Sequence, residues 1–378
     1  MENKSKSVII IPCYEPPFVV NDYVKELTSH ENVEVVAVND GSAKEFDRVF
    51  EALKTIEKCT VISYEVNQGK GHALKVALEY CKQNYSSNDN FVTADCDGQH
   101  YVKDVLNCAK SADENKNSLI LGVRDFSLPQ VPARSKFGNI NTRRMFAFLY
   151  GIKISDTQTG LRAFNYSLID DLLAVKGERF EYEMSMLIQM PRNGHNIVEV
   201  PIDTVYEKKQ EDVNTRSHFK TFEDSVKVWG VLLGNMANFI LAGLIATLID
   251  LGIFALLYYI GFKNLSENAE TRTLLSSVIA RVCSSIVNFL VCKKVVFHSS
   301  NKFSSVKYYA LWIMQLGASY LFTYLIGNLL LGTLIVLVKA VFDTIISLLS
   351  YKIQQIWVFK KNKEQNKKTP LKGVFIFL

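Results

Sequence analysis

Hydrophobic and polar positions follow two different patterns in the two halves of the chain. In residues 1–220, short apolar runs rich in β-branched residues alternate with stretches whose apolar positions recur at helical spacing. Such alternation is typical of a parallel sheet covered by helices, and it predicts an α/β domain. The predicted strands are residues 7–11, 33–38, 60–65, 90–94, 118–123 and 197–202, and the predicted helices include residues 18–28, 44–58, 72–83 and 134–150.

The second half of the chain has long apolar stretches that few charges interrupt. Asp250 is the one charge in residues 238–260, Arg281 is the one charge in residues 274–292, and residues 308–338 have none. About 20 apolar residues are enough to cross the hydrocarbon core of a bilayer. The pattern therefore predicts an all-α transmembrane domain of four helices in residues 237–360. The spans are expected at about residues 238–260, 274–296, 308–331 and 333–358.

Lysines outside the spans predict the orientation of the chain in the membrane. Lys293, Lys294, Lys302 and Lys307 lie between the second and third spans, and residues 361–378 form a basic tail after the fourth. Basic loops are retained on the cytoplasmic side of a membrane. We therefore expect a multi-pass integral membrane protein whose N-terminal domain and basic tail are both cytoplasmic.

Four ionisable residues fall within the predicted spans, where charge is costly and often functional. They are Asp250, Arg281, Lys339 and Asp343. Lys339 and Asp343 are four residues apart, so they can pair with each other or contact a lipid phosphate. The sequence leaves both interpretations open.

Residues 218–236 separate the two halves and have helical spacing of apolar residues. Phe219, Phe222, Val226, Trp229 and Leu233 recur on one face of this stretch. It is either an interfacial helix that lies on the bilayer or a connector helix packed on the N-terminal domain.

Composition excludes several classes of protein. The 378 residues have a formal net charge of +5, and no interleaving of basic and aromatic residues points to nucleic acid. The seven cysteines are scattered without a C-x-x-C pair, which argues against a disulfide framework and against a zinc site.

The most informative polar stretch is residues 93–100, which follow a predicted strand. Asp95, Asp97 and Gln99 are spaced two residues apart, so in extended backbone their side chains point the same way. Oxygen ligands of this kind suit Mg²⁺ or Mn²⁺, and such a cation would serve a phosphate-bearing substrate. A pair of aspartates with no metal is the alternative.

Polar residues also follow two other predicted strands. Tyr14 and Glu15 follow the first strand, and Asp40 follows the second. Ligands bind beyond the carboxyl ends of the strands in open α/β sheets, so these residues are expected to share one edge with Asp95 and Asp97. Asp40 suits a base or ribose, although an Asp before Gly commonly shapes a turn.

Basic residues in this half offer candidate phosphate contacts. Lys70 lies between two glycines before a predicted helix, an arrangement that suits phosphate or a simple helix-entry turn. Guanidinium groups suit phosphate as well, although most loop arginines are simply solvated. The candidate arginines are Arg124, Arg134, Arg162 and Arg216.

Several of these motifs occur together in a familiar order. They are residues 11–15 (IPCYE), 39–42 (NDGS), 67–71 (NQGKG), 95–100 (DCDGQH), 134–135 (RS), 156–162 (DTQTGLR) and 217–219 (SHF). Together they resemble the family 2 inverting glycosyltransferases with a GT-A fold, and most of all polyprenyl-phosphate sugar synthases of the dolichol-phosphate mannose synthase type. The resemblance covers roughly residues 6–225, and it implies a GT-A glycosyltransferase domain in residues 1–217.

The resemblance implies roles for individual residues. It implies catalytic roles for Asp95, Asp97, Asp156, Arg124 and Arg134, and a nucleotide site of Pro12, Tyr14, Glu15, Asp40, Lys70 and Asp95. It implies that Asp97, Gln99 and Asp95 hold Mg²⁺ or Mn²⁺. It implies acceptor or phosphate contacts for Arg124, Arg134, Ser135, Thr159, Arg216, His218 and Lys220. Asn39 stands where many members have Asp, which leaves the nucleoside contact more dependent on Asp40.

The membrane half resembles the GtrA-like four-span domain through residues 243–251 and 354–359. The two resemblances together imply an enzyme that transfers a sugar from a nucleotide sugar, such as UDP-glucose or GDP-mannose, to undecaprenyl or dolichyl phosphate. An ionised acceptor phosphate needs no strong base, so no catalytic base is assigned and Asp156 is the first to test. Alternatives are a flippase with a donor-binding module and a processive polymer synthase. Small four-span modules often associate, so a homo-oligomer is among the expected states.

Overall fold

The computed structural model describes residues 5–129, 131, 133–203, 223–262, 269–327 and 333–359. The chain divides into two units. The first comprises Met1–Ala147 and Ile152–Leu232, and the second comprises Phe148–Gly151 and Leu233–Leu378.

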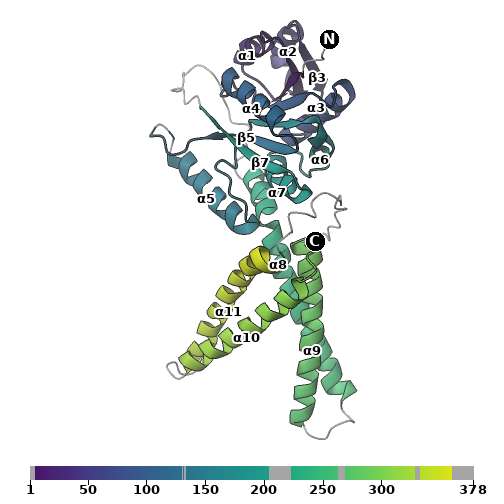
Figure 1. The fold of residues 1–378 in the computed structure, drawn as a ribbon, viewed down its shortest axis with the longest axis vertical. Coiled ribbons are helices and arrows are strands. Elements are labelled where there is room, and N and C mark those ends of the chain that lie inside the picture. Colours follow the sequence, from purple (N-terminus) through teal and green to yellow (C-terminus); the bar gives the residue numbers. More distant parts are fainter. Residues whose placement is uncertain are drawn as a thin grey trace. The chain divides into compact units, whose positions relative to one another are not determined.

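A seven-stranded sheet forms the centre of the first unit (Figure 1). The strand order is β3-β2-β1-β4-β6-β5-β7, and β6 is antiparallel to both of its neighbours while the remaining pairs are parallel. The strands are β1 (Ser7–Cys13), β2 (Val33–Asp40), β3 (Cys59–Tyr64), β4 (Asn90–Thr93), β5 (Ser118–Arg124), β6 (Arg162–Asn165) and β7 (Asn196–Ile202). The predicted α/β domain with a mostly parallel sheet is therefore confirmed.

Strand β6 is an element of the sheet that the sequence pattern missed. The polar composition of residues 154–162 predicts a turn before Ala163 and Phe164, whereas the structure inserts Arg162–Asn165 between β4 and β5. All four residues of β6 are buried. Such a short strand has no recognisable period of its own, because its pairing partners come from distant parts of the chain.

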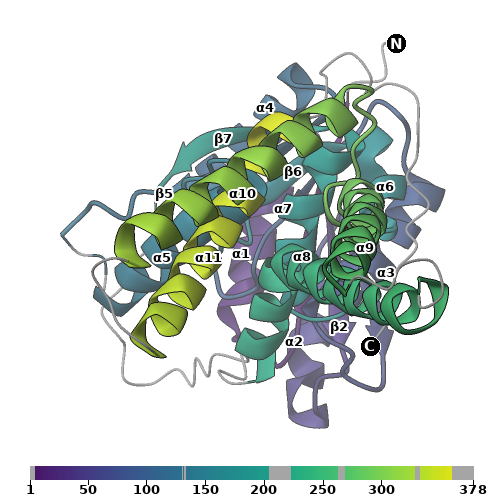
Figure 2. The same ribbon diagram turned by 90° about the horizontal axis from the view of Figure 1, so that it is seen from below.

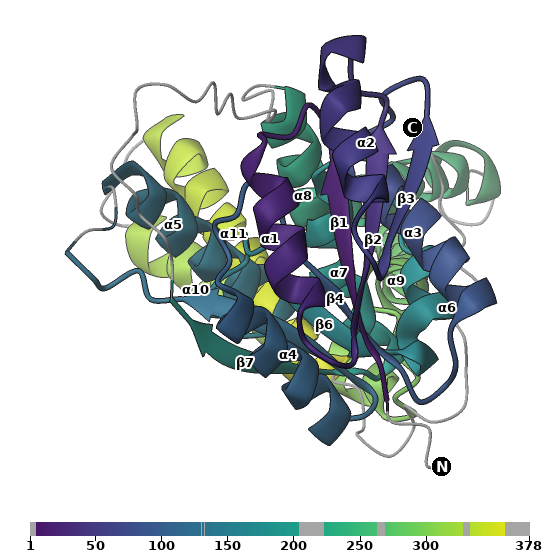
Figure 3. The ribbon, with the colours of Figure 1, turned by 90° about the horizontal axis from the view of Figure 1, so that it is seen from above.

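Helices cover both faces of the sheet, which explains why its central strands are apolar throughout. Ile9 and Ile11 of β1 share a buried cluster with residues of α1 (Val19–Thr28), α2 (Asp47–Lys54) and α4 (Val102–Glu114). Figure 3 shows α1 and α4 on the same side of the sheet. The helices α3 (Lys70–Asn84), α6 (Ile169–Leu173) and α7 (Glu181–Asn193) pack together, and α3 contacts β1 and β2. Short 3₁₀ turns occur at η1 (Lys44–Phe46) and η2 (Tyr166–Leu168).

A close approach between α3 and the start of α7 requires two glycines. A Cβ on Gly69 would lie 2.6 Å from the Cγ of Arg179, and a Cβ on Gly71 would lie 2.6 Å from the Cβ of Tyr182. Gly69 also has a φ of +107°, which L side chains rarely adopt. The Gly-Lys-Gly motif thus lets the start of α3 lie directly against residues 178–182.

The second unit is helical. Its helices are α8 (Glu223–Leu256, which begins in the first unit), α9 (Ala269–Val291), α10 (Ser304–Gly327) and α11 (Thr333–Ile353). Three of them end in π-helical turns, η3 (Leu257–Gly261), η4 (Cys292–Val296) and η5 (Gln354–Val358). Figures 1 and 2 show α10 beside α11. The last residues of α5 (Ala133–Tyr150) also belong to this unit, where the Tyr351 hydroxyl donates to the carbonyl of Leu149 at 3.0 Å.

Two helices in the described part of the chain are long and apolar enough to cross a membrane. They are Glu223–Gly261 and Glu270–Val296, with mean hydropathies of 2.4 and 1.8. The predicted connector from residue 223 onward and the predicted first span form a single helix, α8. Within this unit the carboxylate of Asp250 accepts a hydrogen bond from Ser284 at 3.0 Å and lies 3.6 Å from Arg281. The side chains of Lys339 and Asp343 lie outside the described residues.

We expect Gly71→Ala to lower the free energy of unfolding by about 1–3 kcal/mol, because overpacking would force the start of α3 away from α7. The added Cβ would lie 2.6 Å from the Cβ of Tyr182 and 2.9 Å from the Arg179 carbonyl oxygen. The midpoint of thermal unfolding of the full chain in detergent measures the effect. Gly138→Ala on α5 is the matched control, since no atom lies within 4 Å of its added Cβ. Equal midpoints for the two variants would contradict the prediction.

Candidate active site

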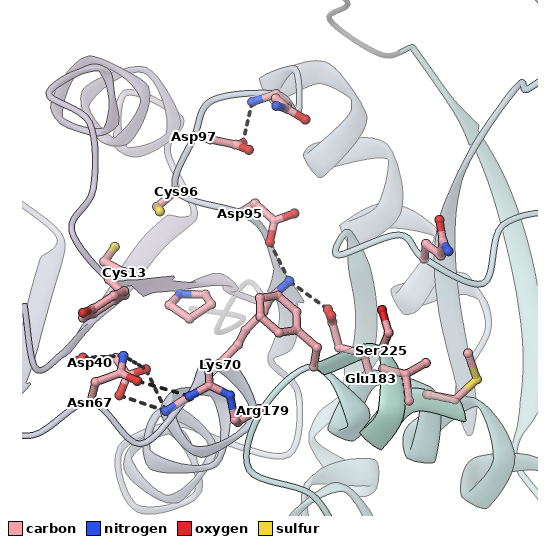
Figure 4. A pocket seen from close by; sticks show the side chains of 18 of the residues that line it. Cys13, Asp40, Asn67, Lys70, Asp95, Cys96, Asp97, Arg179, Glu183 and Ser225 are labelled. Atoms are coloured by element: carbon pink, nitrogen blue, oxygen red, sulfur yellow. Dashed lines mark hydrogen bonds and ion pairs between the residues drawn. The ribbon is translucent and has the colours of Figure 1, made fainter. Parts of the chain in front are cut away.

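A cavity of about 1220 Å³ lies at the carboxyl ends of β1, β2 and β4 (Figure 4). It is bordered by the loops after these strands, by the start of α3 and α7, and by the first turns of α8. The sequence-predicted residues that line it are Pro12, Tyr14, Glu15, Asp40, Lys70, Asp95, Asp97 and Gln99. The parallel sheet therefore brings the predicted nucleotide and metal residues together at one edge.

The ammonium group of Lys70 bridges two carboxylates at the floor of this cavity (Figure 4). Its Nζ lies 2.7 Å from Oδ1 of Asp95 and 2.9 Å from Oε1 of Glu183. Burial alone lowers the pKa of Lys70, but the two carboxylates outweigh it and hold the pKa above its ordinary value. Lys70 is therefore charged at any physiological pH.

Asp95 is held from three directions. Lys70 contacts one carboxylate oxygen, and Nε2 of His100 lies 3.3 Å from the other. Burial raises the pKa of Asp95, but Lys70 and His100 together lower it well below its ordinary range. On the third side Asp95 packs against the backbone of Gly160, where an added Cβ would lie 2.4 Å from Oδ2.

Asp97 has fewer protein partners than Asp95 in the described structure. Its Oδ1 accepts the backbone N–H of Gln99 at 3.0 Å, and burial, followed by the charge of Asp95, raises its pKa. The described residues contain no cluster of three His, Cys, Asp or Glu side chains suited to a metal ion. Mg²⁺ usually takes one or two carboxylates and completes its ligands with substrate phosphates and water. The assignment of Mg²⁺ or Mn²⁺ to Asp97, Gln99 and Asp95 stays a prediction.

Asp40 has a structural task in this structure. Its carboxylate accepts the hydroxyl of Tyr64 at 2.8 Å, the amide of Asn67 at 3.0 Å and the backbone N–H groups of Gln68 and Gly69 at 2.8 and 2.9 Å. These bonds fix the loop before α3, which supports the turn interpretation. Its contact with a nucleoside stays a prediction.

Asn39, which departs from the family pattern, also fixes a loop. Its side-chain oxygen accepts the backbone N–H of Ser42 at 3.0 Å, and the Ser42 hydroxyl accepts the backbone N–H of Glu15 at 2.9 Å. An amide oxygen is thus sufficient to tie the first two loops of the cavity together.

Arg124 and Asp156 form an ion pair and are absent from the residues that line the cavity. The carboxylate of Asp156 is fully buried and accepts Nε of Arg124 at 2.6 Å, Nδ2 of Asn139 at 2.9 Å and the N–H of Gln158 at 2.9 Å. The carboxylate therefore has a full set of donors and serves to position Arg124 and the chain after Asp156. A role as base would require these bonds to break.

The remaining predicted residues divide into two groups. Thr159 is buried, and its hydroxyl accepts the N–H of Leu161 at 3.2 Å. The side chains of Arg134 and Ser135, and all of Arg216, His218 and Lys220, lie outside the described residues. Their acceptor and phosphate contacts stay predictions.

Arg162 is not available for phosphate, contrary to the expectation for the loop arginines. It is 1% exposed, and its guanidinium donates to the carbonyl oxygens of Thr159 at 3.1 Å and Glu183 at 2.7 Å. It therefore joins the segment around Gly160 to the start of α7.

Sequence reasoning missed Glu183 and Arg179, which lie at the start of α7 and just before it. Arg179 lines the cavity, and its Nε donates to the buried carboxylate of Asp224 on α8 at 3.0 Å. The first turns of α8 also line the cavity, through Ser225, Val228, Trp229 and Leu232. This favours the connector interpretation of the start of α8, packed on the N-terminal domain.

Comparison with known proteins assigns both halves of the chain. Residues 8–173 match the family model described as glycosyl transferase family 2, and residues 238–370 match the GtrA/DPMS transmembrane domain. The first half is therefore a GT-A-like mixed α/β domain with a seven-stranded sheet. The chain therefore joins a glycosyl transferase family 2 domain to a GtrA/DPMS transmembrane domain.

Similar proteins include two archaeal enzymes. UDP-N-acetylglucosamine–dolichyl-phosphate N-acetylglucosaminyltransferase of Methanococcus voltae is 28% identical over 218 residues, which cover 52% of this chain and 85% of that protein. Dolichyl-phosphate hexose transferase of Haloferax volcanii is 36% identical over 72 residues, which cover 19% and 31%. The crystal structure of glucosyl-3-phosphoglycerate synthase from Mycobacterium tuberculosis with Mn²⁺, UDP and phosphoglyceric acid has a TM-score of 0.46 and 16% identity, covering 61% of this chain and 78% of that one.

We expect Asp156→Ala to lower the free energy of unfolding by roughly 1–3 kcal/mol, because it removes the shared acceptor of Arg124 and Asn139. Thermal unfolding of the full chain in detergent measures this loss. A protein with unchanged stability and no turnover would contradict the structural role and point to a catalytic base.

Gly160→Ala tests the packing of Asp95. The added Cβ would lie 2.4 Å from Oδ2, so the carboxylate must move. A displacement of about 1 Å in an active site can cost about 100-fold in rate, and we expect a loss of that order in sugar transfer. Gly138→Ala serves again as the control. A folded Gly160→Ala protein as active as the control would show that the position of Asp95 is not critical.

Proposed function

We propose that this protein transfers a sugar from a nucleotide sugar to polyprenyl phosphate, either undecaprenyl or dolichyl, at the cytoplasmic face of a membrane. The observation that carries the proposal is the union, in one chain, of a charged glycosyltransferase cavity and a GtrA/DPMS membrane domain. Two similar proteins are named for the transfer of a sugar to dolichyl phosphate. The product is a lipid-linked sugar for glycan modification of the cell envelope.

The donor is a nucleotide sugar of the UDP-glucose or GDP-mannose kind, bound in the cavity at the sheet edge. Pro12, Tyr14, Glu15 and Asp40 would surround the nucleoside at one end, and Lys70 lies at the floor. Asp97 and Gln99, with Asp95, would hold Mg²⁺ or Mn²⁺, which supplies electrostatic stabilisation of the departing nucleoside diphosphate.

The acceptor requires little acid–base chemistry. A phosphate monoester is already ionised near neutral pH, so its oxygen can attack the anomeric carbon without a strong base. The engagement of Asp156 with Arg124 and Asn139 agrees with this. Attack in line with the leaving group inverts the anomeric centre. Arg124, Arg134 and Ser135 are the proposed contacts of the acceptor phosphate, and Thr159, Arg216, His218 and Lys220 complete the set.

Four spans are proposed for the membrane domain, residues 237–360. Besides α8 and α9, α10 has 24 residues and α11 has 21. At 1.5 Å per residue these helices are about 36 and 32 Å long, enough for a hydrocarbon core of about 30 Å. The lysines between spans two and three support a cytoplasmic side for the catalytic domain, residues 1–217, and for the basic tail, residues 361–378. Residues 218–236 connect the two domains.

We expect Asp97→Ala to reduce sugar transfer by roughly 10²–10³-fold, because it removes a ligand of the cation that would stabilise the leaving diphosphate. The assay uses full-length protein in detergent with polyprenyl phosphate, Mn²⁺ or Mg²⁺ and a panel of UDP- and GDP-sugars. Asp22→Ala, at an exposed site on α1 (83% exposed), is the control and should retain activity.

Two outcomes would overturn the proposal. One is an Asp97→Ala protein as active as the control, which refutes the cation assignment. The other is the absence of lipid-linked sugar across the whole panel, combined with translocation of a preformed lipid-linked sugar by Asp97→Ala protein in vesicles. That result would identify a flippase whose N-terminal domain only binds a donor.

A further inference from the structure

Lys70 occupies the position where a cation would be most useful to the enzyme. Its side chain is 17% exposed, and its ammonium lies between carboxylates from two elements that are distant in sequence, the end of β4 and the start of α7. Figure 4 shows Asp95 and Glu183 directed at it from opposite sides. Its charge balances only one of the two, and Asp97 adds a further negative charge to the same cavity.

The bridge has a consequence for any divalent ion that approaches Asp95 and Asp97. Oδ1 of Asp95 is already in contact with Lys70 at 2.7 Å, and Oδ2 faces His100 at 3.3 Å. A second cation at this carboxylate would be repelled by the ammonium at short range, where charges near a protein surface interact by several kcal/mol. The ion can therefore bind well only if Lys70 moves away or if more negative charge enters the cavity.

We propose that Lys70 is a built-in counterion that occupies Asp95 until a nucleoside diphosphate enters, and that Glu183 then holds Lys70 beside the diphosphate. The inference rests on the proposed donor site. Two phosphates bring the negative charge that both Lys70 and the divalent ion need, so the ion and the nucleotide bind together. The divalent ion alone binds weakly.

The surroundings of Glu183 and Asp95 support a fixed frame around a movable lysine. The carbonyl of Glu183 accepts the guanidinium of Arg162 at 2.7 Å, and Arg162 also donates to the carbonyl of Thr159 at 3.1 Å. Asp95 packs against Gly160 in that same segment. One short segment thus sets the positions of both carboxylates, whereas Lys70 has a flexible four-carbon side chain.

Arg179 also lines the cavity, but it is not the movable cation. Its Nε donates to the buried carboxylate of Asp224 at 3.0 Å, and its guanidinium lies 3.5 Å from the amide oxygen of Asn67. These contacts hold it against α8 and the loop before α3. Glu183 is therefore a positioning residue for Lys70, and Lys70 is the group that meets the donor.

Binding of Mn²⁺ tests the proposal without any turnover. Full-length protein in detergent is titrated with Mn²⁺ alone, and the free ion is followed by electron paramagnetic resonance. A second titration uses UDP or GDP with saturating Mn²⁺ and is followed by calorimetry. Lys70→Met should bind Mn²⁺ alone about tenfold more tightly, because a change of about 1.4 kcal/mol is tenfold in affinity and the competing ammonium is gone. The same variant should bind the nucleotide with Mn²⁺ about tenfold more weakly.

Glu183→Gln provides a second and opposite readout. Without Glu183, Lys70 pairs with Asp95 alone, so Mn²⁺ alone should bind more weakly than in the starting protein, and the nucleotide with Mn²⁺ should also bind more weakly. Lys82→Met, at a partly exposed position on the same helix (46% exposed), is the matched control and should change neither titration. A misfolded protein loses both kinds of binding, so the gain expected for Lys70→Met cannot arise from damage to the fold.

The outcomes separate this inference from the proposed function. If Lys70→Met binds Mn²⁺ no more tightly than the control variant does, the proposed counterion role of Lys70 is refuted. The counterion role is also refuted if Glu183→Gln matches Lys82→Met in both titrations. If Lys70→Met does not fold, the Glu183→Gln result alone decides whether the counterion role stands. If Asp97→Ala loses Mn²⁺ binding in those experiments, the proposed cation site stands even though the counterion role of Lys70 is refuted. Unchanged Mn²⁺ binding in Asp97→Ala refutes the cation site itself.

Discussion

The bridge from Lys70 to Asp95 and Glu183 is the contact on which the geometry of the site depends. It joins the first residue of α3, the end of β4 and the start of α7, which come together only when the sheet and its covering helices are assembled. Leaving either carboxylate without Lys70 would place a partly buried charge in the cavity without its partner, which is strongly unfavourable. The folded domain therefore forms the polar centre of the proposed donor site with these three side chains.

Local signals in the sequence were sufficient for much of the fold and part of the site. Apolar, β-branched runs identified six of the strands, and the rule that ligands bind at the carboxyl ends of strands gathered Asp40, Asp95 and Asp97 at one edge. The antiparallel strand β6 and the role of Glu183 were beyond local reasoning. Both depend on contacts between residues that lie scores of positions apart, such as the contact of Lys70 with Glu183.

Asp40 and Asp156 show why residue type and place in a motif do not suffice to assign chemistry. Each belongs to one of the motifs on which the family resemblance rests, and each uses its carboxylate to accept several hydrogen bonds from the protein itself. Asp97, by contrast, accepts one backbone N–H in the described structure and has room for a further partner. The number of protein donors at a carboxylate, which only the folded chain reveals, distinguishes an acid that shapes the site from one that meets a ligand.

The close contacts of three glycines restrict amino-acid substitution on one side of the cavity more than on the side formed by α8. An added Cβ would lie 2.6 Å from Arg179 at Gly69, 2.6 Å from Tyr182 at Gly71 and 2.4 Å from Asp95 at Gly160. The wall contributed by α8 includes the larger apolar side chains of Val228, Trp229 and Leu232. Single substitutions on α8 can therefore widen or narrow the cavity, while the contacts of Lys70, Asp95 and Glu183 stay the same.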